Sequence, residues 1–363
     1  QSPQTTFALR GSLQNPSIEV DTEIDGRYQD RRFTLTIDAE GSRTSARFSQ
    51  AHLASGDSEV RAKGLLDWTG DTTNLQVNME NLTQDLLQLA PETVTEAVPE
   101  ELRFDASGAL QVSGPLRKPQ VNVQGLVTGD YAGAAETLPY RLTLDGGVQV
   151  GNLQELRLAV QRLELQVFDT PTLVVEGKYE PAGMDLHLRM ASLPTRMLAA
   201  LGWHKVDGEA EADIRLQGSL RQPLIQGFLE YRDQLPGRGG RMPIAIHAEM
   251  ATEGDDFTML TTIKHNDEPA GNLSLSLPLG LYLQPQGQQA VPLHLDAQGV
   301  WDLRFLRLFV NPVDHRFNGK LGADFTVRGT VQKPAFVGEL KLTEGTYSNA
   351  VTGTQLEDIT LIL

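Results

Sequence analysis

The sequence predicts an all-β protein: an elongated, repetitive β-sheet curled into a taco-like or gutter-like solenoid, with an apolar concave face and a few short amphipathic helices. Three observations predict this fold. Apolar and polar residues alternate over most of the 363 residues, glycine and proline recur between the alternating runs, and one Gly-Pro motif returns at a nearly constant spacing. Such alternation is typical of strands, and Gly and Pro are typical of the turns between them.

The alternation is clearest between Leu273 and Leu283, where six leucines occupy the odd positions and Ser274, Ser276 and Gly280 stand among the even ones. Two shorter runs, 156–160 and 163–167, follow the same pattern. Because successive side chains of a strand point to opposite faces, each run gives one apolar and one polar face. The residues that we predict to line the apolar face are Leu142, Leu144, Leu156, Leu158, Val160, Leu186, Leu188, Leu273, Leu275, Leu277, Leu279, Leu281, Leu283, Leu293, Leu295, Phe325 and Val327.

The recurring motif reads Gly, a small residue or Pro, Leu or Val, Gln or Arg, any residue, and Pro. It occupies 11–16, 114–119, 218–223 and 329–334, and alternating runs flank each copy. Glycine permits a kink, and proline cannot donate a hydrogen bond to a strand ladder, so each copy is expected to form a corner between two strands. The corner residues are Gly11 and Pro16, Gly114 and Pro119, Gly218 and Pro223, and Gly329 and Pro334.

The spacing of the motif divides the chain into repeats. The four glycines are 103, 104 and 111 residues apart, which gives approximate units 1–113, 114–217, 218–328 and a truncated 329–363 within one elongated repeat region. A unit of about 105 residues has room for roughly eight strands of ordinary length. Stacking of such units builds a quasi-one-dimensional protein in which each unit contacts its neighbours.

Three short amphipathic helices are expected upstream of the later motifs, at 82–89, 195–201 and 302–309. Each segment carries apolar residues at i, i+3 and i+4, and a Pro or Gly follows it. Helices of two or three turns are not stable alone. They are expected to plug corners of the sheet, and the alternative is a helix that lies on a membrane surface.

Composition excludes several classes of function. The net charge of −16 and the isoelectric point near 4.9 disfavour nucleic acid as a partner, because phosphates require a basic patch and the Lys and Arg residues are scattered. The absence of cysteine excludes disulfides and thiolate chemistry. No stretch reaches the roughly 18 apolar residues of a membrane-spanning helix. The chain starts without Met and stops inside an alternating run, so we expect a fragment of a longer protein.

No motif points to catalysis, a cofactor or a metal. The seven histidines do not pair at metal-binding spacing. The turn at 237–241 is rich in Gly and Arg but lacks the residues of a phosphate loop, and Asp21, Glu23 and Asp25 lack the later Glu of a calcium loop. Nucleophile-elbow motifs are missing as well. We therefore expect a protein that is not an enzyme.

The corners also carry a resemblance to a known family. The Gly-x-Leu-(Arg/Gln)-x-Pro corners, each followed by a short strand, resemble the repeats of the TamB family within the wider AsmA-like group. The segment 344–359 is similar to the run that enters the conserved C-terminal region of that family. The resemblance covers essentially the whole chain.

The resemblance implies a β-taco that crosses the periplasm and is anchored in the inner membrane by a segment absent from this sequence. It implies conduction of phospholipid to the outer membrane along a hydrophobic groove that contacts acyl chains. It also implies a link to outer-membrane protein assembly through a TamA-like barrel partner, at regions outside this fragment.

Other interpretations of the alternation remain open. A closed sandwich or a filled solenoid would show the same period of two, because any sheet that packs against another layer has one apolar face. A chaperone-like scaffold would pair its exposed strand edges with unfolded barrel strands. An adhesive or structural rod with a sealed core is a third possibility. An outer-membrane barrel is disfavoured because the aromatic girdles are missing.

Overall fold

The protein is described by a computed structural model of the whole chain. The structure describes residues 4–12, 16–28, 31–83, 102–132, 137–149, 156–180, 182–195, 208–219, 222–237, 240–254, 256–266, 268–278, 293–304, 315–330 and 333–363. The chain divides into two compact units, Gln1–Pro181 (unit 1) and Ala182–Leu363 (unit 2).

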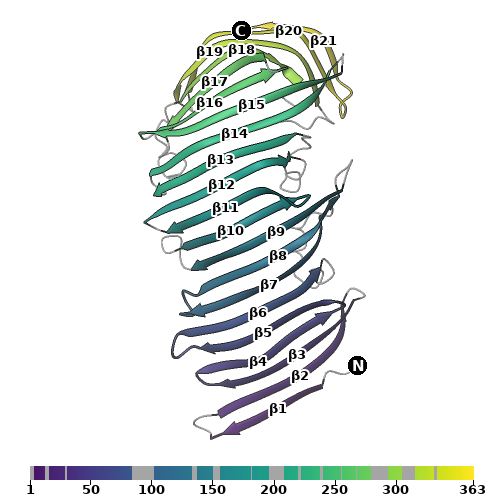
Figure 1. Cartoon of the computed structure of the whole chain (residues 1–363), viewed down its shortest axis with the longest axis vertical. Coiled ribbons are helices and arrows are strands. Elements are labelled where there is room, and N and C mark those ends of the chain that lie inside the picture. Colours follow the sequence, from purple (N-terminus) through teal and green to yellow (C-terminus); the bar gives the residue numbers. More distant parts are fainter. Residues whose placement is uncertain are drawn as a thin grey trace. The chain divides into compact units, whose positions relative to one another are not determined.

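Unit 1 consists of eleven described strands in an antiparallel meander, in which each strand pairs with the next one along the chain (Figure 1). The strands are β1 (Gln4–Gly11), β2 (Pro16–Tyr28), β3 (Arg31–Ser42), β4 (Ser45–Ser55), β5 (Ser58–Asp67), β6 (Thr72–Thr83), β7 (Leu102–Gly114), β8 (Gln120–Ala132), β9 (Thr137–Gln149), β10 (Arg157–Val167) and β11 (Thr170–Glu180).

Unit 2 repeats this meander with ten described strands, again paired in chain order. They are β12 (Gly183–Pro194), β13 (Glu209–Ser219), β14 (Gln222–Gly237), β15 (Gly240–Glu253), β16 (Asp256–His265), β17 (Glu268–Pro278), β18 (His294–Asp302), β19 (His315–Thr330), β20 (Lys333–Asn349) and β21 (Gln355–Ile362). The predicted all-β fold is confirmed, since the described elements of both units are antiparallel strands.

The expected helices differ from the structure at their first residues. Leu82 and Thr83 are the last residues of β6, and Asp302 is the last residue of β18, so the predicted helix starts at 82 and 302 are wrong. Tertiary pairing explains this, since Leu82 continues the ladder opposite Ala106. Thr195, Leu303 and Arg304 adopt 3₁₀ turns, and the rest of the three segments lies outside the described residues.

Cross-strand register aligns the apolar side chains of successive strands. Directly opposed residues of an antiparallel pair point to the same face of the sheet. In unit 1, one such row crosses β2 to β6 through Ile24, Leu35, Leu53, Val60 and Met79. Every residue of the row is apolar, so the apolar positions of five strands meet on one face, which we call the apolar face of unit 1.

Unit 2 has an equivalent row. It crosses β16 to β20 through Met259, Leu275, Leu295, Val327 and Phe336. The opposite side of each unit, which carries the intervening positions of the strands, is called its polar face.

β-bulges keep the apolar residues on one face where the period of two breaks. An extra residue moves the following side chains to the other face, so a bulge restores the alternation after an odd spacing. β10 has its irregularity between Val160 and Leu163, and it joins 163–167 to all of the run at 156–160 except Leu156, which precedes it. β6 and β12 have similar breaks, where Asn81 and Ser192 adopt positive φ angles of 51° and 47°.

The core of each unit lies on the apolar face. In unit 2, Ile244, Ile263, Ala297, Trp301 and Ala323 form a buried cluster. In unit 1, the buried apolar side chains include Tyr131, Leu138, Tyr140 and Val167, which come from β8, β9 and β10.

The four motifs occupy equivalent places. Each connects an odd-numbered strand to the next even-numbered one, so the motifs within a unit lie at the same end of its strands. Gly11, Gly218 and Gly329 stand opposite Pro16, Pro223 and Pro334, and Gly114 and Pro119 flank the turn between β7 and β8.

Six described strands, against the roughly eight expected, lead from one motif to the next, and many of them are longer than average; β14, for example, has 16 residues. The boundaries of the four repeats stay a prediction.

The corner geometry depends on glycine at Gly218. Its φ angle is +85°, and a Cβ there would lie 2.7 Å from the carbonyl oxygen of Gln222. We expect Gly218→Val to lower the free energy of unfolding by about 2 kcal/mol, because a β-branched residue is strained at this φ angle and meets the backbone. Urea unfolding of the variant and the wild type would measure this difference in the free energy of unfolding.

Gly41→Ala is the matched control, since a Cβ at Gly41 has no neighbour closer than 3.9 Å. It is not expected to lower stability. An unchanged midpoint for Gly218→Val would show that the corner does not require glycine.

Candidate functional site

The apolar faces are the candidate functional surfaces, and the described strands carry most of the residues predicted to line them. Leu142 and Leu144 lie in β9, Leu158 and Val160 in β10, Leu186 and Leu188 in β12, Leu273, Leu275 and Leu277 in β17, Leu295 in β18, and Phe325 and Val327 in β19. Leu156 and Leu293 immediately precede β10 and β18. Leu279, Leu281 and Leu283 lie outside the described residues.

The register brings some of these residues together and keeps others apart. In unit 2, Leu275, Leu295 and Val327 are successive cross-strand partners. In unit 1, β9 and β10 are neighbours, but Leu142 and Leu144 stand opposite Leu165 and Leu163 rather than opposite Leu158 and Val160. Leu186 and Leu188 belong to the same sheet face as the β17 residues, with β13 to β16 between them.

Sequence analysis missed many residues of the apolar faces. Val77, Leu110 and Val123 form one row in unit 1, and this row continues to Gly146 and Val160. Glycines such as Gly146 occupy apolar-face positions and interrupt the alternation in the sequence. The missed residues carry the same period-two signal in shorter runs.

The predicted lining residues keep part of their surface exposed. None of those described is fully buried: Leu158 is 37% exposed, and the remainder are half-buried. By contrast, Leu138 and Leu193 are 0% and 1% exposed. Packing between two closed layers buries core side chains almost completely. The apolar faces therefore retain surface that a ligand could cover.

A polar cluster borders the apolar face of unit 2, next to the buried Trp301. The Arg304 Nε donates to Asp302 Oδ1 at 2.8 Å, and its Nη2 lies 2.5 Å from Asp302 Oδ2. His265 stands opposite Ile244 on the same face. Burial lowers the pKa of His265, and the charge of Arg304 lowers it further, against the opposing effect of Asp302.

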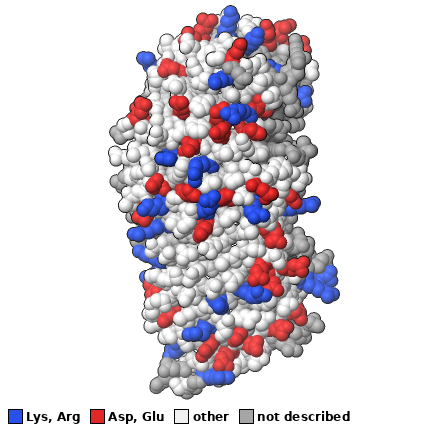
Figure 2. Space-filling model, in the orientation of Figure 1, with Lys and Arg blue, Asp and Glu red and all other residues white. Residues whose placement is uncertain are grey.

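The other faces are polar and carry charges of both signs, which Figure 2 shows scattered over the side of the molecule turned to the viewer. Arg162 and Glu176 form an ion pair across β10 and β11, and a hydrogen bond of 2.7 Å joins His187 Nε2 and Asp213 Oδ1 across β12 and β13. A hydrogen bond from Thr326, with a further one from His294, lowers the pKa of Asp296. Exposed pairs of this kind contribute little to stability and keep the face solvated.

Neither a cluster of metal ligands nor a membrane-spanning helix is present in the part of the chain that the structure describes. No group of three or more His, Asp or Glu side chains there is arranged to hold a metal ion. The same residues include no helix of the length and apolarity needed to cross a membrane.

The half-buried His265 makes the stability of unit 2 depend on pH. Since the folded protein holds the pKa of His265 below its ordinary 6.5, the unfolded chain binds this proton more readily. The contribution of the neutral imidazole is fully present above pH 6.5 and is lost as pH falls below that value. We expect wild type to lose more stability than His265→Gln between pH about 7.5 and about 5.5, measured by urea unfolding. Equal losses would contradict the assignment.

Comparison with known proteins identifies one family. Residues 1–230 match the family described as "TamB, N-terminal domain". Comparison with curated proteins and with solved structures gives no significant match.

Proposed function

Because the chain belongs to the TamB family, whose members are periplasmic, envelope-associated proteins of the translocation and assembly module, we propose that it conducts phospholipid between the inner and outer membranes. In this proposal the acyl chains travel along the apolar faces, and the chain performs no catalytic step. An inner-membrane anchor and a TamA-like barrel partner belong to the same proposal.

The energetics of lipid transfer favour an apolar surface of this kind. Exposing an acyl chain to water costs about 0.8 kcal/mol per CH₂, so a lipid with two chains faces a barrier of some tens of kcal/mol. Apolar contact along the whole path offsets most of this cost. Transfer requires no shaped pocket, because fluid chains need a continuous surface rather than specific contacts.

One observation carries the proposal: the apolar rows continue from strand to strand, and the described lining residues are half-buried. The row from Met259 to Phe336 crosses five strands without a polar residue. Leu275 and Leu295, within this row, retain exposed surface. A rod with a sealed core would also have continuous apolar rows, but its lining residues would be almost completely buried.

A second candidate function is a scaffold for outer-membrane protein assembly, acting with a TamA-type barrel by strand pairing. The observation that favours it is the apolar surface of β1, where Phe7 and Leu9 are 70% and 76% exposed. A strand of this kind can accept an added strand wherever its edge is free. This function uses backbone groups of the edge rather than the apolar lining.

Site-specific photo-crosslinking would test lipid conduction. A photoreactive residue would replace Leu144 or Leu277 on the apolar faces and, as matched controls on the same strands, Thr143 or Ser276 on the polar faces. We expect irradiation in cells to attach phospholipid at Leu144 and Leu277 only, as detected by mass spectrometry. Adducts at all four positions, or at none in folded protein, would argue against the proposal and leave strand pairing as the better candidate.

Charge substitution provides a second test. Leu277→Asp is expected to lower the yield of lipid adducts at Leu144 or Leu275 about tenfold, because a carboxylate in the lipid path must be desolvated. Ser276→Asp places the same charge on the polar face, beside His294, and should leave the yield unchanged. Equal effects of the two variants, with equal melting temperatures, would mean that the apolar face is not the path.

A further inference from the structure

The polar face of unit 1 contains a block of side chains that differs from the rest of that face. Three cross-strand rows over β6, β7 and β8 define nine adjacent positions. Seven of the nine carry a carboxamide, and none carries a charge; they are Asn74, Gln76, Asn78, Ser113, Gln111, Ala109, Gln120, Asn122 and Gln124. We call these residues the amide block. On the neighbouring β5, the same face carries Arg61 and Lys63.

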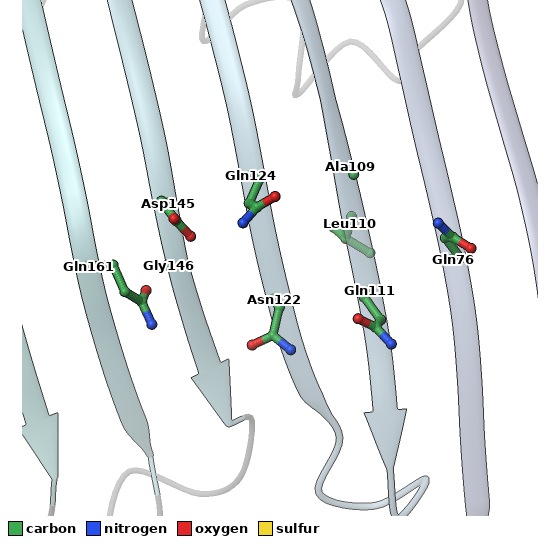
Figure 3. Close-up of a pocket in the computed structure, with 9 residues that line it drawn as sticks. All are labelled: Gln76, Ala109, Leu110, Gln111, Asn122, Gln124, Asp145, Gly146 and Gln161. Carbon is green, nitrogen blue, oxygen red and sulfur yellow. The ribbon is translucent and has the colours of Figure 1, made fainter.

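A shallow depression opens in this block and extends over β9 and β10 (Figure 3). Ala109 and Gly146 also line it, and the polar side chains that Figure 3 labels come from β6, β7, β8, β9 and β10. Gln161 is the extra residue of the β10 bulge, between Val160 and Arg162 in the ladder with β9. The polar side chains that line the depression are Gln76, Gln111, Asn122, Gln124, Asp145 and Gln161.

The amides of the depression have hydrogen-bonding capacity to spare. Within the described residues, the side chains of Gln76, Gln111, Gln124 and Gln161 make no hydrogen bond to the protein, and all four are exposed. The Asn122 Oδ1 accepts from Gln120 Nε2 at 3.4 Å. Each carboxamide offers two N–H donors and a carbonyl acceptor. The surface therefore presents donors and acceptors side by side over five strands.

The lining excludes most classes of ligand. An anion would meet the carboxylate of Asp145 in the lining, whereas the cations of this face, Lys63 opposite Gln76 and Arg162 opposite Asp145, lie outside it. A metal ion would find one carboxylate where hard cations require several oxygen ligands. An apolar ligand would contact little beyond Ala109, because the Leu110 side chain belongs to the apolar face. An added peptide strand needs a free edge, and β6 to β10 are each paired on both sides.

We propose that the amide block and its depression bind a neutral saccharide chain. Sugar hydroxyls both donate and accept, and vicinal hydroxyls match the paired donor and acceptor of a carboxamide. A linear chain laid across the strands would contact several amides at once. Ordering these exposed side chains costs free energy at each contact, so affinity comes from the number of contacts. The opposite face of the sheet stays available for its own ligand.

Binding of defined oligosaccharides to the full chain would test this proposal. Cellohexaose and chitohexaose supply neutral hexamers, and an oligogalacturonate hexamer supplies a charged one. We expect isothermal titration and saturation-transfer NMR to detect a neutral hexamer, with binding to the charged hexamer at least about tenfold weaker because of Asp145. The double variant Gln111→Ala, Gln124→Ala should weaken neutral binding about tenfold.

Two further variants separate the depression from the rest of the surface. Ala109→Leu places a larger apolar side chain in the lining and should also weaken binding about tenfold, whereas Gln226→Ala with Gln298→Ala removes two exposed amides from unit 2 and should not. Absence of binding to both neutral hexamers, or equal loss in the unit 2 variant, would overturn the proposal. Self-association that the block variants abolish would overturn it too, in favour of an amide zipper between two copies.

Discussion

The fold depends on one constraint, which is that cross-strand register must place the apolar residues of every strand on a common face. A slip of one residue would turn a whole strand of apolar side chains to solvent. The chain meets the constraint with long ladders, such as the uninterrupted eleven-residue register between β13 and β14, and with bulges where the alternation is broken. The core cluster around Ile244 and the half-buried leucines of β17 both follow from this alignment.

The two faces then serve different purposes. The apolar face of each unit combines a few buried residues with lining residues such as Leu144 and Leu275 that keep exposed surface, which is the property that a lipid path requires. The polar face carries ion pairs on several strands, as between Arg162 and Glu176, and an uncharged amide block over β6 to β8. Since side chains alternate between faces, one sheet can present both surfaces with independent sequence requirements.

Membership of the TamB family agrees with the sequence motif that first indicated it. The motif residues Gly218 and Pro223 are cross-strand partners, and the positive φ of Gly218 explains why glycine stands there. Proline has no N–H to donate to the neighbouring strand, and this is tolerated at the start of a strand. The motif therefore has a structural role, which is to form a corner between two paired strands.

The sequence by itself determined the strand class, the two faces and the corners, because a period of two and the Gly-Pro turns are local properties of the chain. Six leucines on odd positions between 273 and 283 are sufficient to predict an apolar face. Only the tertiary structure decided that 157–160 and 163–167 form one bulged strand and that Leu82 extends β6. It also decided that the lining leucines stay half-buried. The register, the bulges and the burial of each side chain depend on residues of neighbouring strands, which are far away in the sequence. The same holds for the amide block, whose residues come from three separate strands.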